Sequence, residues 1–280
     1  ERWHPSLAFH PMNLKALIRK AKDEPGGTAP NRPGATNGYS SRADDPKALT
    51  LSESKGMSKE QELELAQDLP VMSPTSTVKA APPSVMLMEE WLPPEAEAVL
   101  LGNLQARHAD FVQLRGKRTA MYGGKPGPSF EPEALPSWLQ KLCESVSASS
   151  AMEEVPNHVL VNQYQAGEGI MPHTDGPAYL PRAAILSLGS AVVFEFWRDH
   201  AHAKTGESPV SLLLPPRSLL VFEAEAYTSH LHGIADRRFD ELQGVANWTA
   251  EAQSRYQGPD APDWAQRQLV TSGLRRAERY

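Results

Sequence analysis

Histidine and aspartate, two metal-ligating residue types, lie close together in the segment Pro172-His173-Thr174-Asp175-Gly176. In an extended backbone, residues two positions apart point to the same side, so His173 and Asp175 can reach one metal ion. A second histidine would complete a set of two imidazoles and one carboxylate. Such a set occupies one face of an octahedron and suits a non-haem Fe(II) that also binds a cosubstrate and dioxygen. The same ligands can hold a hydrolytic Zn²⁺.

The third ligand is expected from a later segment, Tyr227 to Gly233. It contains His230 and His232, again two positions apart, so the spacing alone does not decide between them. The other histidines have no comparable partner, and we expect them to be ordinary surface or loop residues: His4, His10, His108, His158, His200 and His202.

Asn162 and Tyr164 share one face of the expected strand that precedes this motif. An amide and a phenol at these positions could donate hydrogen bonds to a carboxylate or keto oxygen of a bound ligand. The alternative is a half-buried strand with polar ends.

The elements that position these residues are mostly strands. No segment with helical periodicity separates them, which argues against a parallel βαβ sheet and favours sequential antiparallel strands closed into a jelly-roll or cupin-like barrel. Gly189-Ser190 can form a two-residue hairpin turn, and Pro215 to Arg217 punctuates another pair. The expected strands are His158–Gln165, Ala183–Leu188, Ala191–Trp197, Val210–Leu214 and Ser218–Phe222.

Helices are expected before the strands, at Glu95–Ala106 after Pro94 and at Ser137–Val146, where Trp138, Leu142 and Val146 share a face. The predicted fold class is therefore mainly β with flanking helices (α+β). We place this domain at residues 85–280.

Residues 1–84 are expected to lie outside the domain, as a short helix followed by a largely disordered segment rich in Pro, Gly, Ser and charge. Residues 12–22 have helical spacing. A small surface helix is the preferred interpretation, and a basic helix that docks on a membrane or a partner protein is the alternative. A capping-box pattern at Ser58 and Gln61 interrupts the linker.

Composition excludes several classes of protein. The net charge of −6 excludes a generally basic protein that coats nucleic acid. The single cysteine, Cys143, excludes a disulfide within the chain and a Cys-rich metal module. The longest apolar stretch, Ala183–Trp197, is too short and too interrupted to span a bilayer. We expect a soluble protein of a reducing compartment, the cytoplasm or the nucleus or both.

Two stretches, Val159–Leu188 and Ser211–Ile234, resemble the AlkB family of Fe(II)- and 2-oxoglutarate-dependent dioxygenases, and within it the branch of the sixth AlkB homologue. The resemblance rests on the run Asn162-Gln163-Tyr164, followed by Gly-x-Gly and then Pro-His-x-Asp-Gly, which is specific as a set. It extends from about Val85 to the end of the sequence.

The resemblance implies a double-stranded β-helix and an iron held by His173, Asp175 and the histidine that precedes glycine, His232. It also implies that Asn162 and Tyr164 contact 2-oxoglutarate. The family has a late Arg-Tyr-Asn-Leu-Thr-x-Arg strand whose two arginines bind the cosubstrate. Here only Arg279 and Tyr280 match it, so Arg279 is the candidate carboxylate partner. We expect that the sequence is truncated within that strand.

The function implied is oxidative demethylation of N-alkylated bases in RNA or single-stranded DNA. Residues 101–125 are locally basic and resemble the family's nucleotide-recognition lid, which makes Arg115, Lys117, Arg118 and Tyr122 candidate substrate contacts. A solvated basic loop is the alternative. Two other functions stay open: a binding or scaffold protein whose residues 1–84 recruit a protein partner, and a hydroxylase of a protein or small molecule.

Overall fold

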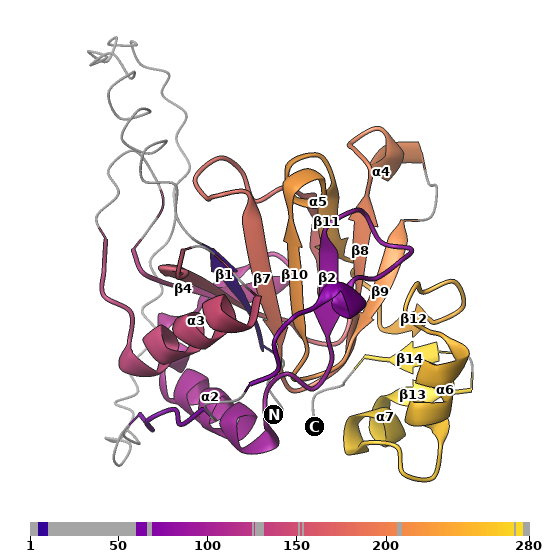
Figure 1. The fold of residues 1–280 in the computed structure, drawn as a ribbon, viewed down its shortest axis with the longest axis horizontal. Coiled ribbons are helices and arrows are strands. Elements are labelled where there is room, and N and C mark those ends of the chain that lie inside the picture. The colour runs from indigo at the N-terminus through magenta and orange to yellow at the C-terminus, as the bar shows by residue number, and fades with distance from the viewer. Residues whose placement is uncertain are drawn as a thin grey trace, which may run out of the picture.

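The computed structural model describes residues 5–10, 60–65, 69–124, 126, 132–150, 152, 154–205, 209–271 and 273–276. Two antiparallel sheets face each other, and two helices cover the outer side of the larger one (Figure 1). The larger sheet has the order β2-β10-β7-β1-β5-β4-β3 and the smaller one β6-β11-β8-β9. This arrangement confirms the predicted jelly roll with flanking helices.

The larger sheet consists of β1 Pro5–His10, β2 Val85–Met88, β3 Val112–Leu114, β4 Lys117–Tyr122, β5 His158–Gln163, β7 Arg182–Ser187 and β10 Leu219–Glu223. The smaller sheet consists of β6 Ile170–His173, β8 Val192–Trp197, β9 Val210–Leu214 and β11 Leu231–Ile234. Outside these two sheets lie β12 Phe239–Glu241, β13 Leu269–Val270, β14 Gly273–Arg275, α4 His202–Thr205, α5 Ala224–Thr228, α6 Ala250–Gln257 and α7 Asp263–Gln268, with 3₁₀ turns at Pro74–Ser76 and His108–Asp110.

The chain winds between the two sheets rather than turning back within one. β7 pairs with β10 and β8 pairs with β9, so the connections β7–β8 and β9–β10 cross from sheet to sheet. The hairpin predicted at Gly189-Ser190 is therefore wrong, and so is the strand pair predicted around Pro215. These strands are largely buried, and a continuous apolar run does not reveal which strand is its neighbour.

Alternate residues of the central strands build two cores. Leu220 and Phe222 of β10 face the smaller sheet and pack with Phe194 and Phe196 of β8. Leu219 and Val221 of the same strand face the opposite way, toward the helices. The inner core leaves room for a pocket between the sheets, which is where the candidate ligands lie.

The two predicted helices are confirmed as α2 Pro94–Ala106 and α3 Ser137–Ser150. Proline at the first position of α2 and acidic residues in its first turn favour the helix start. Trp138, Leu142 and Val146 are fully buried against the sheet, as their shared face predicts.

Parts of residues 1–84 belong to the domain, which corrects the boundary placed at residue 85. β1 lies between β5 and β7 in the middle of the larger sheet. Residues 60–65 form neither helix nor strand. Asn103 donates to the carbonyl of Gln61 and accepts from its N–H, and Leu63 is 1% exposed in the helix-side core. These tertiary contacts override the helix signal at Ser58. The helix predicted at residues 12–22 lies outside the described residues.

The basic stretch is a hairpin rather than a loop: β3 and β4 form one edge of the larger sheet. The turn between them needs Gly116, whose φ is 78° and whose Cβ position would lie 2.9 Å from the carbonyl oxygen of Gly169. Among the described residues, none of the helices has the length and apolar character needed to cross a membrane.

Candidate metal centre and active-site pocket

Three metal-ligating side chains from two paired strands and the loop after one of them converge between the sheets. His173 ends β6, Asp175 follows in the loop, and His232 lies opposite His173 in β11. One ligand atom from each residue lies within 4.8 Å of the other two. Asp175 Oδ1 is 3.8 Å from His173 Nε2 and 3.4 Å from His232 Nε2. The structure thus brings together the three predicted ligands.

The orientation of His173 leaves Nε2 available for a metal. Its Nδ1 donates to the carbonyl of Met171 at 2.9 Å, so the proton of the neutral ring is on Nδ1. Burial, and next the neighbouring His232, lower the pKa of His173 below its usual value. Both effects favour the neutral imidazole that metal binding requires.

His232 is held by aromatic side chains. It is 4% exposed, its ring stacks on Phe194 at a centroid distance of 5.7 Å, and Phe222 lies 5.0 Å away. His230 is different: its Nδ1 contacts the carbonyl oxygen of Glu225 at 3.2 Å, and the residue is outside the ligand cluster. Because β11 begins only at Leu231, the alternation of an extended strand does not include His230. In the described geometry it is therefore His232, and not His230, that lies with His173 and Asp175.

A pocket opens beside the three ligands, and all three line it. Asn162 and Tyr164 line it together, as their shared strand face predicts. Asn162 Oδ1 is buried without a hydrogen-bond partner among the described residues. Burial raises the pKa of Tyr164 above its usual value, which keeps its hydroxyl a hydrogen-bond donor. These are polar groups available to a ligand.

Lys117 of β4 is the single cationic side chain among the described residues that line the pocket. Burial lowers the pKa of Lys117 to about 8, and the nearby carboxylate of Asp175 opposes that shift. Its neighbour Arg115 is exposed in the β3–β4 turn. Of the four predicted substrate contacts, Lys117 is the one that lines the pocket.

The structure does not bring Arg118 and Tyr122 to the pocket. Side chains alternate along β4, so both lie on the opposite face from Lys117. Arg118 donates to Gln163 Oε1 at 3.1 Å, and Tyr122 donates to Asp110 Oδ2 at 3.1 Å. These contacts serve packing against the helices. Arg279 lies outside the described residues.

The residues present fit both groups that the resemblance implies. Two imidazoles and a carboxylate would hold Fe(II), and a set of only three protein ligands would leave positions for a cosubstrate and dioxygen. Asn162, Tyr164 and Lys117 are potential donors to a dicarboxylate there. One further polar side chain, Ser187 of β7, lines the pocket; it lies in an ordinary apolar strand and carries no motif signal that would reveal it from the sequence.

Comparison with known proteins decides the family. Residues 84–260 match the family described as the 2OG-Fe(II) oxygenase superfamily. A Danio rerio protein named probable RNA/DNA demethylase ALKBH6 is 39% identical over 167 residues, which is 56% of this chain and 71% of that protein. The chain belongs to the AlkB family of these oxygenases.

Two other curated relatives of this AlkB-family chain are matched over about half of their length or less. The Xenopus tropicalis tRNA (carboxymethyluridine(34)-5-O)-methyltransferase alkbh8 is 28% identical over 255 residues, 82% of this chain and 38% of that protein. An uncharacterised mimivirus protein, L905, is 32% identical over 114 residues, 40% of this chain and 52% of its own. The solved structure of OsALKBH1 is 16% identical, with a TM-score of 0.45, over 67% of this chain and 92% of that one.

As an AlkB-family member, the chain is a 2-oxoglutarate-dependent dioxygenase that uses Fe(II). When bound, these groups supply the oxidation of a substrate C–H bond by dioxygen, with conversion of 2-oxoglutarate to succinate and CO₂. The chain's own residues hold and orient the reactants. The apolar walls formed by Ile185, Phe194 and Leu214 exclude water from the pocket.

Proposed function

We propose that this oxygenase removes alkyl groups from N-alkylated bases in RNA or single-stranded DNA. His173, Asp175 and His232 are the iron ligands, and Asn162 and Tyr164 contact 2-oxoglutarate. The observation that carries the proposal is the convergence of three ligand atoms within 4.8 Å at a pocket that Lys117 also lines. The names of the ALKBH6 and alkbh8 relatives, a demethylase and a tRNA-modifying enzyme, support a nucleic-acid substrate.

The reaction places few proton-transfer demands on the protein. Hydroxylation of an N-alkyl carbon gives an unstable product from which the alkyl group leaves as an aldehyde. The tasks left to the chain are to orient the alkyl carbon toward the metal and to keep water out. The apolar lining residues Ile185, Phe194 and Leu214 suit the second task, while Asn162 and Tyr164 are left to hold the cosubstrate, because each offers a polar group inside the pocket.

The β3–β4 hairpin suits a flexible strand of nucleic acid. Residues directly opposite each other in a sheet share a face, so Val112 and Leu114 lie on the same face as Thr119 and Lys117. Val112 is 62% exposed and Leu114 is 44% exposed. Apolar side chains can contact bases, and the ammonium group of Lys117 can contact a phosphate. The small charge favours a single strand over long duplex.

The cellular setting follows from the same proposal. We place the enzyme in the cytoplasm or the nucleus, where RNA and single-stranded DNA occur, and its one cysteine, Cys143, is free and buried. The protein partner predicted for residues 1–84 stays a prediction, since most of that segment lies outside the described residues.

The test is mass spectrometry of nucleosides after incubation of the chain with Fe(II), 2-oxoglutarate and N-methylated RNA or DNA oligomers. We expect loss of the methyl mark with stoichiometric succinate, and no loss with Asp175→Ala. Succinate release without any change in the oligomers would instead favour a protein or small-molecule substrate. Absence of succinate under every condition would favour a non-catalytic protein.

A further inference from the structure

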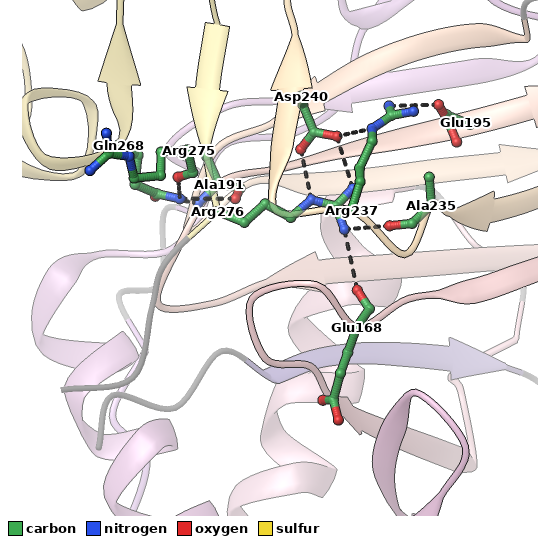
Figure 2. Close-up of polar contacts among 9 residues, drawn as sticks. All are labelled: Glu168, Ala191, Glu195, Ala235, Arg237, Asp240, Gln268, Arg275 and Arg276. Atoms are coloured by element: carbon green, nitrogen blue, oxygen red, sulfur yellow. Dashed lines mark hydrogen bonds and ion pairs between the residues drawn. The ribbon is translucent and has the colours of Figure 1, made fainter.

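A largely buried network of charged side chains lies beyond the pocket, where the small sheet β12-β14-β13 meets the barrel (Figure 2). Asp240 of β12 is completely buried and accepts from two arginines. Arg276 donates to it twice, at 2.7 and 2.9 Å, and Arg237 donates once, at 2.6 Å. Arg237 also donates to the buried Glu195 of β8 at 2.8 Å. Two acids and two guanidinium groups make the network neutral.

The other side of the Arg276 guanidinium binds two backbone carbonyls. It donates to the carbonyl oxygen of Ala235 at 2.6 Å and to that of Glu168 at 3.2 Å (Figure 2). Ala235 is the residue after β11, and Glu168 is two residues before β6. Arg276 therefore joins the end of one metal-bearing strand to the start of the other.

These two strands are the ones that carry both imidazole ligands. His173 pairs with His232, and Ile170 pairs with Ile234, with a register shift between the two pairs. An irregular ladder of this kind lacks a full set of regular hydrogen bonds to define its geometry. The carbonyls bound by Arg276 lie next to the Ile170–Ile234 pair, at the irregular end of the ladder.

The same network also contacts β8, the third strand of this sheet. Glu195, the partner of Arg237, lies opposite Gly233 in the β8–β11 pairing, and Gly233 is the neighbour of His232. The network thus contacts β6, β8 and β11. An arginine fork provides this geometry because it presents several donors in one rigid plane, whereas a lysine presents a single point charge.

We propose that Arg276 is a positioning residue for the metal centre: held by Asp240, it fixes β6 and β11 relative to each other and so sets the distance between the His173 and His232 ligand atoms. The catalytic reaction does not involve Arg276 directly. Arg276 therefore raises metal affinity, because ligands that are pre-positioned bind a metal more tightly than ligands that must be brought together.

The experiment measures Co²⁺ binding to the metal-free chain by visible absorption, together with the melting temperature of the metal-free chain. We expect Arg276→Lys to weaken Co²⁺ binding by roughly tenfold, the size typical of residues that support metal ligands. Arg276→Gln and Asp240→Asn should weaken it at least as much. Lysine should restore part of the melting temperature, because it keeps a positive charge beside Asp240, without restoring metal affinity.

Glu97→Gln is the matched control. Glu97 and Arg217 form another half-buried pair, at 3.4 Å, that joins α2 to the β9–β10 connection and does not contact the metal-bearing strands. We expect this variant to lower the melting temperature and leave Co²⁺ affinity within about twofold of the unmodified chain.

The proposal would be overturned if Arg276→Lys lowered the melting temperature, as the control does, but left Co²⁺ affinity unchanged. Arg276 and Asp240 would then be an ordinary buried ion pair. If Arg276→Gln or Asp240→Asn does not fold, Co²⁺ binding is measured in Arg276→Lys and Arg237→Gln instead. Arg237→Gln is a milder change, since the Arg237 side chain is 42% exposed. No nucleic acid is needed, so the outcome is independent of the substrate assigned above.

Discussion

His173 and His232 face each other across one antiparallel strand pair, with ring centroids 4.5 Å apart and planes inclined by 57°. The carboxylate of Asp175 lies within 4 Å of the Nε2 atoms of both rings. Ligands on paired strands are held by the sheet itself, which makes this relationship the most direct basis for mutational tests.

Replacement of Asp175 by alanine should abolish Fe(II)-dependent turnover. The substitution removes the anionic ligand and leaves two neutral imidazoles, so we expect metal affinity to fall by at least about 100-fold. Succinate release and isothermal titration with metal measure the effect. Far-UV circular dichroism should be unchanged, because Asp175 lies in a loop outside the sheets. Full turnover in this variant would exclude the assigned ligand set.

His232→Ala and His230→Ala should differ sharply. The first removes a ligand and should abolish metal binding, whereas the second removes a contact to the carbonyl of Glu225 and should leave metal affinity within about twofold. Parallel metal titrations measure both. A greater loss of metal affinity in His230→Ala than in His232→Ala would mean that β11 does not begin at Leu231 in solution.

The pH dependence of stability should report on Lys117. Its pKa is about 8 in the folded chain, against 10.5 for an ordinary lysine. Between these values the unfolded chain binds more protons, so the contribution of Lys117 to the free energy of unfolding rises with pH. We therefore expect the free energy of unfolding in urea of the unmodified chain to rise, relative to that of Lys117→Met, from pH 8 to pH 10. A constant difference would mean that Lys117 is not buried in solution.

Lys117→Met should also weaken the binding of single-stranded oligomers. Loss of one phosphate contact reduces the slope of log affinity against log salt by about 1. Fluorescence anisotropy at several salt concentrations measures this slope. Arg255→Met is the control, because Arg255 is also cationic but lies on α6, where it pairs with Glu89 and does not line the pocket. Equal slopes for the two variants would argue against nucleic acid at this face.

Leu63→Ala should destabilise the domain, even though Leu63 lies before residue 85, where the sequence predicts that the domain starts. Its side chain is 1% exposed in the helix-side core, and truncation of a buried leucine costs about 2–5 kcal/mol. Chemical denaturation measures the loss. Val71→Ala is the control, since Val71 is 63% exposed. Equal stability of the two variants would show that residues 60–65 do not pack as described.

The sequence predicts the parts of this molecule that depend on local pattern. Period-2 and period-3.6 patterns locate five strands and two helices, and the His-x-Asp spacing locates two ligands. Strand pairing depends on contacts distant in sequence, which explains the incorrect hairpin at Gly189-Ser190. The β3–β4 hairpin was missed because its residues are charged and alternate between the pocket and the helices. The role of Arg276 has no local signal at all, because its partners come from three separate segments.

The position of β1 in the middle of the larger sheet has a consequence for biosynthesis. Residues 5–10 are synthesised well before their partners, residues 158–163 and 184–187. At translation rates of 5–20 residues per second, that strand stays without its neighbours for roughly ten seconds or longer. The barrel therefore closes late, and the nascent chain is expected to need protection from aggregation until β7 has been synthesised.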